Sequence, residues 1–314
     1  MSESERTLRV EQMTRLADGV VEVRLVEPAG EQLPMWEPGA HVVLHLADGL
    51  QRQYSLCGPA SDRASWTVAV HRSPTSRGGS EHVHDRLRVG SSLPVEGPYN
   101  NFPLAEADRY LFLAGGIGIT PILAMTRRLR AAGTPFDLAY CARSSSMMAY
   151  RAEIASWSDP RVRLHADDEN GGPIDVGALL REHAGALVYC CGPESFIAAV
   201  EEHAPEPSLV RVERFRAAPR PETESGSAFD VVLAATGDRL RIEDGQTILD
   251  VLDSAGFDVP SSCREGICGT CETKVVSGTP DHRDSVLTDA ERAENCSMMI
   301  CVSRAKGDEI VLDL

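Results

Sequence analysis

The chain has 314 residues, 42% of them hydrophobic, and its formal net charge at pH 7 is −16. The length predicts two or three domains, the charge argues against nucleic acid and anionic membrane surfaces as partners, and no apolar run of about 18 residues predicts a membrane span. The first six residues lack the apolar segment of a secretory signal, so the nine cysteines predict a reducing, cytoplasmic location and metal or redox roles.

The first hundred residues contain short apolar or alternating segments that are separated by glycine and proline. Segments 20–25, 41–46 and 66–70 have the length and composition of strands. Many short strands with such punctuation predict a small antiparallel barrel.

Two polar groups of residues stand out in this barrel. Arg52 and Tyr54 fall on one face of a strand-like segment, with Ser55 beside them. The turn Gly78-Gly79-Ser80 comes directly before a helical stretch at 81–87, and a glycine turn at a helix N-terminus suits a phosphate group. Each group taken alone is common on protein surfaces.

Between residues 106 and 216 apolar segments alternate with helical ones. Strands that are buried on both faces read as continuous apolar runs, and their alternation with helices predicts a parallel sheet of βαβ units. The five predicted strands are 110–114, 138–141, 162–165, 187–191 and 209–215.

Glycine turns follow two of these strands. Gly115, Gly116 and Gly118 follow the first strand and precede a helix with Pro121 in its first turn, and Cys191-Gly192-Pro193 ends the fourth strand. The carboxyl ends of parallel strands share one edge of the sheet, so the two turns predict a dinucleotide crevice. The sequence lacks the G-x-G-x-x-G pattern, so it does not predict a doubly wound dehydrogenase.

A polar segment at 217–228 with two prolines predicts a linker. The module after it, 229–314, contains 17 Asp and Glu against 8 Lys and Arg, a net charge of −9. Two interpretations of this excess stay open: it serves solubility, or it forms an acidic face for docking a partner protein.

Four cysteines in this module predict a metal centre. Cys263, Cys268 and Cys271 follow the C-x4-C-x2-C spacing of a plant-type [2Fe–2S] site, which needs one remote cysteine as its fourth ligand. Structural zinc is the rival, but zinc sites usually present two close cysteine pairs. Cys301, in an apolar run that can form a buried strand, is the predicted fourth ligand, and Cys296, after a predicted exposed helix at 289–295, is not.

Together these motifs resemble the ferredoxin–NADP reductase superfamily. The order of the domains is similar to that of the phthalate dioxygenase reductase family, which includes the vanillate O-demethylase reductases. The resemblance covers the whole chain and implies a multidomain fold: an antiparallel β-barrel that binds FMN (1–105), an α/β parallel-sheet domain that binds NAD(P) (106–216), the linker, and an α+β β-grasp ferredoxin domain (229–314).

The resemblance also implies roles for individual residues. The flavin site would comprise Arg52, Tyr54, Ser55, Val70, Arg72, Gly78, Gly79 and Ser80. The dinucleotide site would comprise Gly115, Gly116, Gly118, Thr120, Arg143, Cys191, Gly192 and Pro193. The positions beside the reacting rings would be Ser55, Thr120, Cys191 and Phe215, with Phe215 covering the flavin.

The function implied is that of an oxidoreductase. Electrons from NADH would pass through FMN and the [2Fe–2S] cluster to a Rieske-type non-haem iron oxygenase. NADPH is an alternative donor, because Arg143 and Ser144 follow the second strand of the parallel sheet where an acidic residue for the ribose hydroxyls is expected. A reductase for a separate ferredoxin or diiron hydroxylase, and a flavin and iron–sulfur redox sensor, are the alternative functions.

Overall fold

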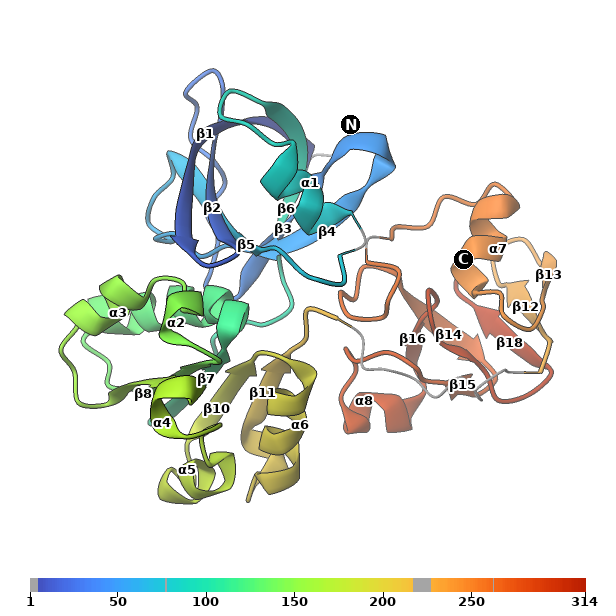
Figure 1. Cartoon of the computed structure of the whole chain (residues 1–314). Coiled ribbons are helices and arrows are strands. Elements are labelled where there is room, and N and C mark those ends of the chain that lie inside the picture. The colour runs from blue at the N-terminus through green and yellow to red at the C-terminus, as the bar shows by residue number, and fades with distance from the viewer. Residues whose placement is uncertain (1–4, 77, 217–226, 262) are drawn as a thin grey trace. The chain divides into compact units, whose positions relative to one another are not determined.

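The structure is a computed structural model that describes residues 5–76, 78–216, 227–261 and 263–314. It divides into two compact units, Met1–Glu213 and Arg214–Leu314 (Figure 1). Residues 217–226 of the predicted linker, 217–228, lie outside the described residues. Among the described residues, no helix combines the length and the apolar character needed to cross a membrane.

The first unit begins with a six-stranded antiparallel sheet and the short helix α1 (Gly79–Asp85). The strand order is β4-β3-β6-β1-β2-β5, and a bridge between Leu56 and Val68 joins the end of β4 to β5. The sheet therefore closes on itself, as predicted for a barrel. Its strands are β1 (Glu5–Ala17), β2 (Val20–Val26), β3 (Ala40–His45), β4 (Gln51–Ser55), β5 (Ser65–His71) and β6 (Ser92–Asn100).

The parallel sheet of the first unit has the order β11-β10-β7-β8-β9. All five strands run parallel, and each overlaps a predicted strand. They are β7 (Tyr110–Gly115), β8 (Asp137–Ala142), β9 (Val162–Ala166), β10 (Leu187–Cys191) and β11 (Val210–Glu213). The helices are α2 (Ile119–Ala132), α3 (Arg151–Ser156), α4 (Asp167–Asn170), α5 (Val176–Glu182) and α6 (Glu194–His203).

Helix α2 illustrates how local sequence defines an element. Pro121 lies in its first turn, where a missing backbone N–H is tolerated. The helix ends at Gly133, which adopts the left-handed conformation at φ +71° that glycine reaches without steric cost. The face of α2 toward β7 and β10 is apolar, so burial of that face fixes the helix on the sheet.

The second unit is a mixed five-stranded sheet with the order β13-β12-β18-β14-β16 and a helix, α7, packed in its core. Central strands β12 and β18 are parallel, as in the predicted β-grasp domain. The sheet strands are β12 (Phe229–Leu233), β13 (Arg239–Ile242), β14 (Glu272–Ser277), β16 (Ser297–Met299) and β18 (Glu309–Leu312). A pair, β15 (Pro280–Asp281) and β17 (Arg304–Ala305), and the helices α7 (Ile248–Ser254) and α8 (Asp289–Glu294) complete it.

One predicted element near Cys301 needs correction. The apolar run that contains this cysteine was expected to form a buried strand, but β16 ends at Met299. Cys301 lies in the turn that follows, in which the N–H groups of Val302 and Ser303 donate to the Met299 carbonyl. The cysteine is still only 2% exposed, so the burial was predicted correctly and the conformation was not.

Candidate cofactor sites

The cysteine loop of the second unit gathers four sulfurs. The thiols of Cys268 and Cys301 donate hydrogen bonds to the sulfur of Cys263 and lower its pKa to about 3. Cys271 is hydrogen-bonded to Cys301 in the same way, which lowers the pKa of Cys271. All four cysteines are free of disulfides, and all except the half-buried Cys263 are buried. Four converging thiol groups with mutually perturbed protonation form a donor set that fits a [2Fe–2S] cluster.

The backbone of the loop also points at the sulfur atoms. The N–H groups of Glu265 and Ile267 lie 3.3 and 3.5 Å from the Sγ atom of Cys263. Such inward N–H groups stabilise negative charge on a thiolate.

Gly266 is required by this loop for two reasons. Its φ is +70°, and a Cβ atom there would lie 2.5 Å from Cγ2 of Val302 and 3.0 Å from Cα of Asp284. Its carbonyl accepts from the N–H of Ser285 at 2.8 Å. The loop is therefore pressed against the segment that contains Asp284, and any side chain at residue 266 would separate them.

Cys296 lies apart from this group. It is exposed, and its thiol lies 3.5 Å from the carbonyl oxygen of Glu294. The structure thus brings Cys301, and not Cys296, to the three closely spaced cysteines. Cys301 therefore stays the predicted fourth ligand.

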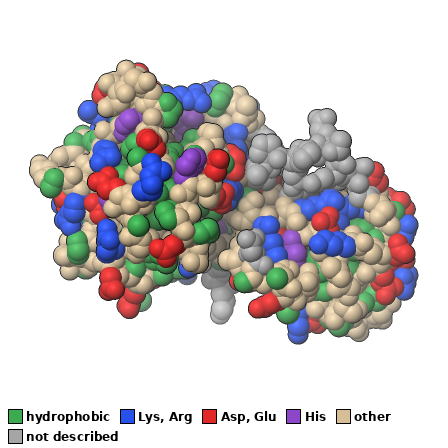
Figure 2. Space-filling model, turned by 90° about the horizontal axis from the view of Figure 1, so that it is seen from below, with side chains coloured by type: hydrophobic (Ala, Val, Ile, Leu, Met, Phe, Trp, Pro, Cys, Tyr) green, Lys and Arg blue, Asp and Glu red, His purple; other side chains and the backbone are tan. Residues whose placement is uncertain are grey.

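The charges of the second unit are partly paired. Arg264 bonds Asp250 at 3.2 Å and Asp253 at 2.6 Å, and Arg239 pairs with Asp230 at 2.9 Å. In Figure 2, the visible face of this unit carries basic side chains beside acidic ones. The net charge of −9 arises because acidic residues outnumber basic ones; on this face they do not form an unbroken acidic patch.

In the first unit, the two glycine turns of the parallel sheet meet at its carboxyl edge. A Cβ atom at Gly118 would lie 2.1 Å from the carbonyl oxygen of Cys191, and one at Gly115 would lie 2.8 Å from Cδ of Pro193. A Cβ at Gly192 would in turn lie 3.0 Å from Cα of Gly115. Glycine is therefore needed on both turns for this close approach, and both turns lie at the edge of the sheet where the dinucleotide site is predicted.

Four further residues named by the sequence analysis lie on or near this edge of the sheet. Thr120 is 1% exposed, and its hydroxyl donates to the carbonyl of Ile117 at 3.0 Å. Gly116 has φ +56° and faces open space. Arg143 and Ser144 follow β8, at the same edge of the sheet, and the Ser144 hydroxyl lies 3.1 Å from that of Ser146.

Two acidic residues at this edge were missed by the sequence analysis. Glu213, at the end of β11, lies opposite Cys191 in the sheet, and its Oε2 atom is buried without a hydrogen-bond partner. Burial raises the pKa of Glu213 to about 8. The second residue is Asp168, whose backbone N–H donates a hydrogen bond to the carbonyl of Arg143 at 3.1 Å. The acidic run after the third predicted strand could have indicated Asp168.

The flavin residues predicted on the barrel lie at β4 and the start of α1. Ser55 is 5% exposed and its hydroxyl has no partner, so a hydrogen-bonding group of a ligand would satisfy it. A Cβ at Gly79 would lie 2.5 Å from Cγ of Arg52, so glycine lets this arginine pack directly against the first turn of α1. Burial raises the pKa of Tyr54, which stays a neutral phenol. The orphaned hydroxyl of Ser55 and the arginine packed beside the start of α1 fit a flavin.

The other predicted flavin residues are engaged within the protein. Arg72 forms a bidentate pair with Asp85 at 2.6 and 2.8 Å, and Ser80 accepts from the N–H of Ser73 at 3.1 Å. Val70 is buried in β5, and its carbonyl faces Nε2 of His84 at 2.9 Å. Gly78 caps α1 in the left-handed conformation. Phe215 is 39% exposed and belongs to the second unit, so its place over the flavin stays a prediction.

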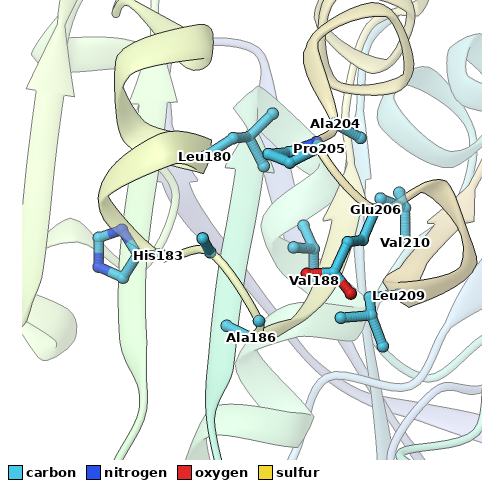
Figure 3. A pocket seen from close by; sticks show the side chains of 11 residues that line it. Leu180, His183, Ala186, Val188, Ala204, Pro205, Glu206, Leu209 and Val210 are labelled. Carbon is cyan, nitrogen blue, oxygen red and sulfur yellow. The ribbon is translucent and has the colours of Figure 1, made fainter.

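A shallow hollow lies at the opposite edge of the parallel sheet. Figure 3 shows it between the end of α5, the amino end of β10 and the segment before β11, with Leu180, Val188 and Leu209 among its lining residues. Because the glycine turns follow the carboxyl ends of β7 and β10, this hollow is separate from the dinucleotide crevice.

Comparison with known proteins identifies two of the domains. An oxidoreductase NAD-binding domain model matches residues 112–202, and a 2Fe-2S iron-sulfur cluster binding domain model matches residues 233–306. The crystal structure of a phthalate dioxygenase reductase, described as modular for electron transfer from pyridine nucleotides to [2Fe–2S], is 35% identical and covers 99% of this chain and 98% of its own, with a TM-score of 0.72.

This chain belongs to the phthalate dioxygenase reductase family. Among the relatives of this reductase are the phenoxybenzoate dioxygenase subunit beta of Ectopseudomonas oleovorans, 44% identical over 98% of this chain and 97% of the relative, and the vanillate O-demethylase oxidoreductase of a Pseudomonas strain, 43% identical over 96% and 98%. It is an oxidoreductase with NAD-binding and [2Fe–2S] domains, and its relatives include reductase subunits of oxygenase systems.

The same set of domains also occurs within longer proteins. An intact type IV self-sufficient cytochrome P450 monooxygenase is 40% identical to this reductase with a TM-score of 0.90, and the alignment covers 99% of this chain. This chain spans only 41% of the length of that monooxygenase.

Proposed function

We propose that this reductase moves electrons from NADH, through FMN and a [2Fe–2S] cluster, to a Rieske-type non-haem iron oxygenase in the cytoplasm. The observation that carries the proposal is the loop in which Cys263, Cys268, Cys271 and Cys301 converge, in a chain that matches oxygenase reductases over nearly its whole length.

The energetics favour a Rieske acceptor. Plant-type clusters have potentials near about −400 mV, whereas Rieske clusters lie between about −150 and +300 mV. An electron would therefore pass downhill from the cysteine loop to the partner. When bound, FMN supplies the conversion of a two-electron hydride into single electrons, which neither nicotinamide nor the cluster can perform alone.

The chain's own residues would hold the flavin on the barrel. Ser55 offers a buried hydroxyl without a partner, and Arg52 offers a cation against the first turn of α1. Gly79 admits the side chain of Arg52 to this turn, where its positive charge would attract a phosphate. The single phosphate of FMN suits this turn, and the resemblance to the family favours FMN over FAD.

The nicotinamide dinucleotide would bind across the two glycine turns, with its pyrophosphate at the start of α2. Thr120 and Cys191 would then lie beside the nicotinamide. At the adenosine end, Arg143 favours a 2′-phosphate. Asp168, whose backbone N–H bonds the carbonyl of Arg143, adds a negative charge nearby that would disfavour one. We therefore keep NADH as the preferred donor and NADPH as the alternative.

A haem monooxygenase is the second candidate acceptor, because the domains of this chain recur in a self-sufficient cytochrome P450. The two acceptors can be separated in one experiment. The protein is reduced with NADH without oxygen and mixed with an oxidised Rieske oxygenase or with a substrate-bound cytochrome P450. Faster reduction of the Rieske centre supports the proposal, and reduction of the haem alone contradicts it.

A further inference from the structure

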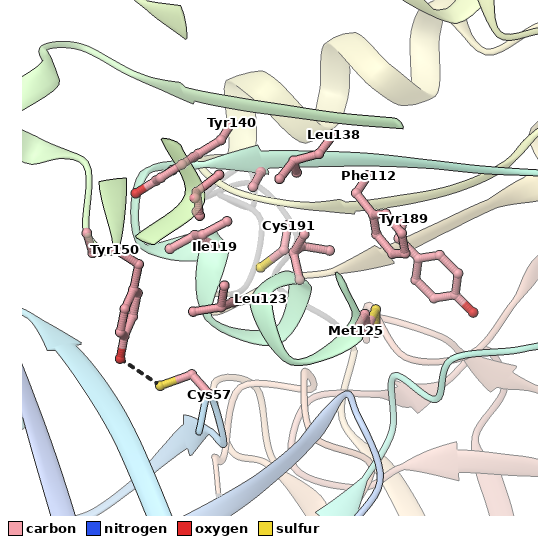
Figure 4. Close-up of a cluster of buried hydrophobic side chains, with 14 of the residues drawn as sticks. Cys57, Phe112, Ile119, Leu123, Met125, Leu138, Tyr140, Tyr150, Tyr189 and Cys191 are labelled. Carbon is pink, nitrogen blue, oxygen red and sulfur yellow. Dashed lines mark hydrogen bonds between the residues drawn. The ribbon is translucent and has the colours of Figure 1, made fainter. Parts of the chain in front are cut away.

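A buried phenol joins the barrel to the parallel-sheet domain. Tyr150 donates its hydroxyl proton to Oε2 of Glu22 at 2.8 Å. The sulfur of Cys57 lies 3.1 Å from the hydroxyl oxygen of Tyr150 (Figure 4). Because the phenol proton faces the carboxylate, the thiol is the donor in the second bond. Burial raises the pKa of Cys57 to about 12 and raises that of Tyr150, so both groups keep their protons at neutral pH.

An arginine of helix α2 completes this network. Arg127 donates from Nη1 to the carbonyl of Cys57 and from Nε to Oε1 of Glu153 at 2.7 Å. Its guanidinium lies 5.5 Å from the centre of the Tyr150 ring. Cys57 is therefore held twice, through its sulfur and through its carbonyl, by residues of the other domain.

Two members of this network lie on or beside elements with a predicted cofactor role. Cys57 follows Ser55 by two residues, where the N–H of Cys57 also bonds the carbonyl of Thr67 and helps to close the barrel. Arg127 lies in α2, which begins just before Thr120. Tyr150 has φ +58°, a left-handed conformation that costs energy for a residue with a side chain. Such strain persists only where the surroundings hold it.

We propose that Tyr150, Cys57, Glu22 and Arg127 form a positioning network that sets the flavin strand β4 and the nicotinamide helix α2 at a fixed separation. The apolar contacts of this interface, which involve Ala17, Val20 and Ala69, are non-directional and permit sliding. Hydrogen bonds depend steeply on distance and angle, so they fix one arrangement. Hydride transfer needs its two atoms within about 3.5 Å, and an error of about 1 Å can cost about a hundredfold in rate.

This inference rests on the proposed function, since a hydride must cross this interface for the separation to matter. The central variant is Tyr150→Phe, which removes the hydroxyl and leaves Cys57 and Glu22 without it. The matched control is Tyr110→Phe in the same unit, because the Tyr110 hydroxyl also makes two hydrogen bonds, to the carbonyl of Ala105 and from the N–H of Ala107. Neither partner lies in a strand of the barrel.

Hydrogen exchange of the resting protein provides the first measurement, and it needs no turnover. Tyr150→Phe should speed amide exchange at Cys57 and in the adjoining end of β5, while Tyr110→Phe should not.

Anaerobic stopped-flow absorbance then follows flavin reduction by NADH. We expect the rate to fall at least about tenfold in Tyr150→Phe, with little change in NADH affinity and a larger isotope effect with deuterated NADH.

Further variants separate positioning from folding. Glu22→Gln keeps an acceptor oxygen and should retain nearly the wild-type rate. Cys57→Ala removes the thiol donor and should slow flavin reduction even if Tyr150→Phe does not fold. Tyr150→Phe and Cys57→Ala proteins that are less stable but reduce their flavin at the wild-type rate would overturn the network. Failure of the wild-type flavin to be reduced by NADH would instead overturn the proposed function.

Discussion

Gly118 provides the sharpest test of the dinucleotide crevice. Its backbone has φ −62°, so alanine is conformationally acceptable there, but the added Cβ would lie 2.1 Å from the carbonyl oxygen of Cys191 and 2.7 Å from the nitrogen of Gly192. Ordinary contact begins at 3.4 Å. The two turns must therefore move apart by about 1.3 Å in Gly118→Ala, the difference between those two distances.

This displacement would move apart the two turns that are predicted to bind the nicotinamide. Misplacement by about 1 Å can cost about a hundredfold in rate, which corresponds to about 2.7 kcal/mol in the activation barrier. We expect kcat/KM for NADH in Gly118→Ala to fall by about this factor. Transfer from chemically reduced flavin to the cluster should be unchanged, because neither turn takes part in it.

The control is Gly133→Ala at the other end of the same helix. Gly133 has φ +71° and no atom within 4 Å of the added Cβ, so alanine there should cost about 1 kcal/mol in stability without changing kcat/KM. Steady-state reduction of an artificial acceptor and stopped-flow reduction of the flavin measure both variants. A Gly118→Ala protein with wild-type kcat/KM would show that the nicotinamide does not bind between these turns.

Three other predictions follow from the sites. Cys301→Ser should lose the visible and EPR signals of the cluster, whereas Cys296→Ser should keep both together with about two irons per chain; the reverse pattern would exchange the two assignments. Burial raises the pKa of Glu213 to about 8 from an ordinary 4.5. The contribution of the protonated Glu213 to stability is therefore present below pH 4.5 and is lost as the pH rises through 8, by up to about 5 kcal/mol. Glu213→Gln should flatten the dependence of the melting temperature on pH in this window, and an unchanged dependence would mean that the carboxylate is solvated. If the net charge of −9 on residues 229–314 guides docking, electron transfer to the oxygenase should slow steeply as salt is added. The Debye length falls from about 30 Å at 0.01 M salt to about 8 Å at physiological ionic strength. Reduction of the flavin should not respond to salt, and equal sensitivity of both steps would leave the charge as a solubility feature.

Local sequence patterns predicted the elements whose signals lie within a few neighbouring residues. The apolar runs gave all five parallel strands because both faces of that sheet are buried, and the cysteine spacing gave the cluster loop because three ligands lie within nine residues. Strand β1 was missed although it is 13 residues long, because charged residues interrupt its buried positions at Leu8 and Val10.

Contacts between distant segments could not be read from the sequence. The hydroxyl of Tyr150 bonds residues that are 93 and 128 positions away, and no periodicity in the sequence encodes such a contact. The same is true of Glu213, whose burial and place opposite Cys191 follow from the pairing of β10 with β11. The sequence predicts where the cofactors bind, whereas contacts such as these emerge only when the chain is folded.

An anaerobic titration with NADH tests the central claim, that one chain carries hydride-accepting flavin and a one-electron cluster in series. The flavin takes two electrons and the cluster one, so full reduction should consume about 1.5 NADH per chain. Absorbance of the flavin and the EPR signal of a reduced [2Fe–2S] cluster should both change before that point. Reduction that stops at about one NADH per chain, with no EPR signal, would contradict the account.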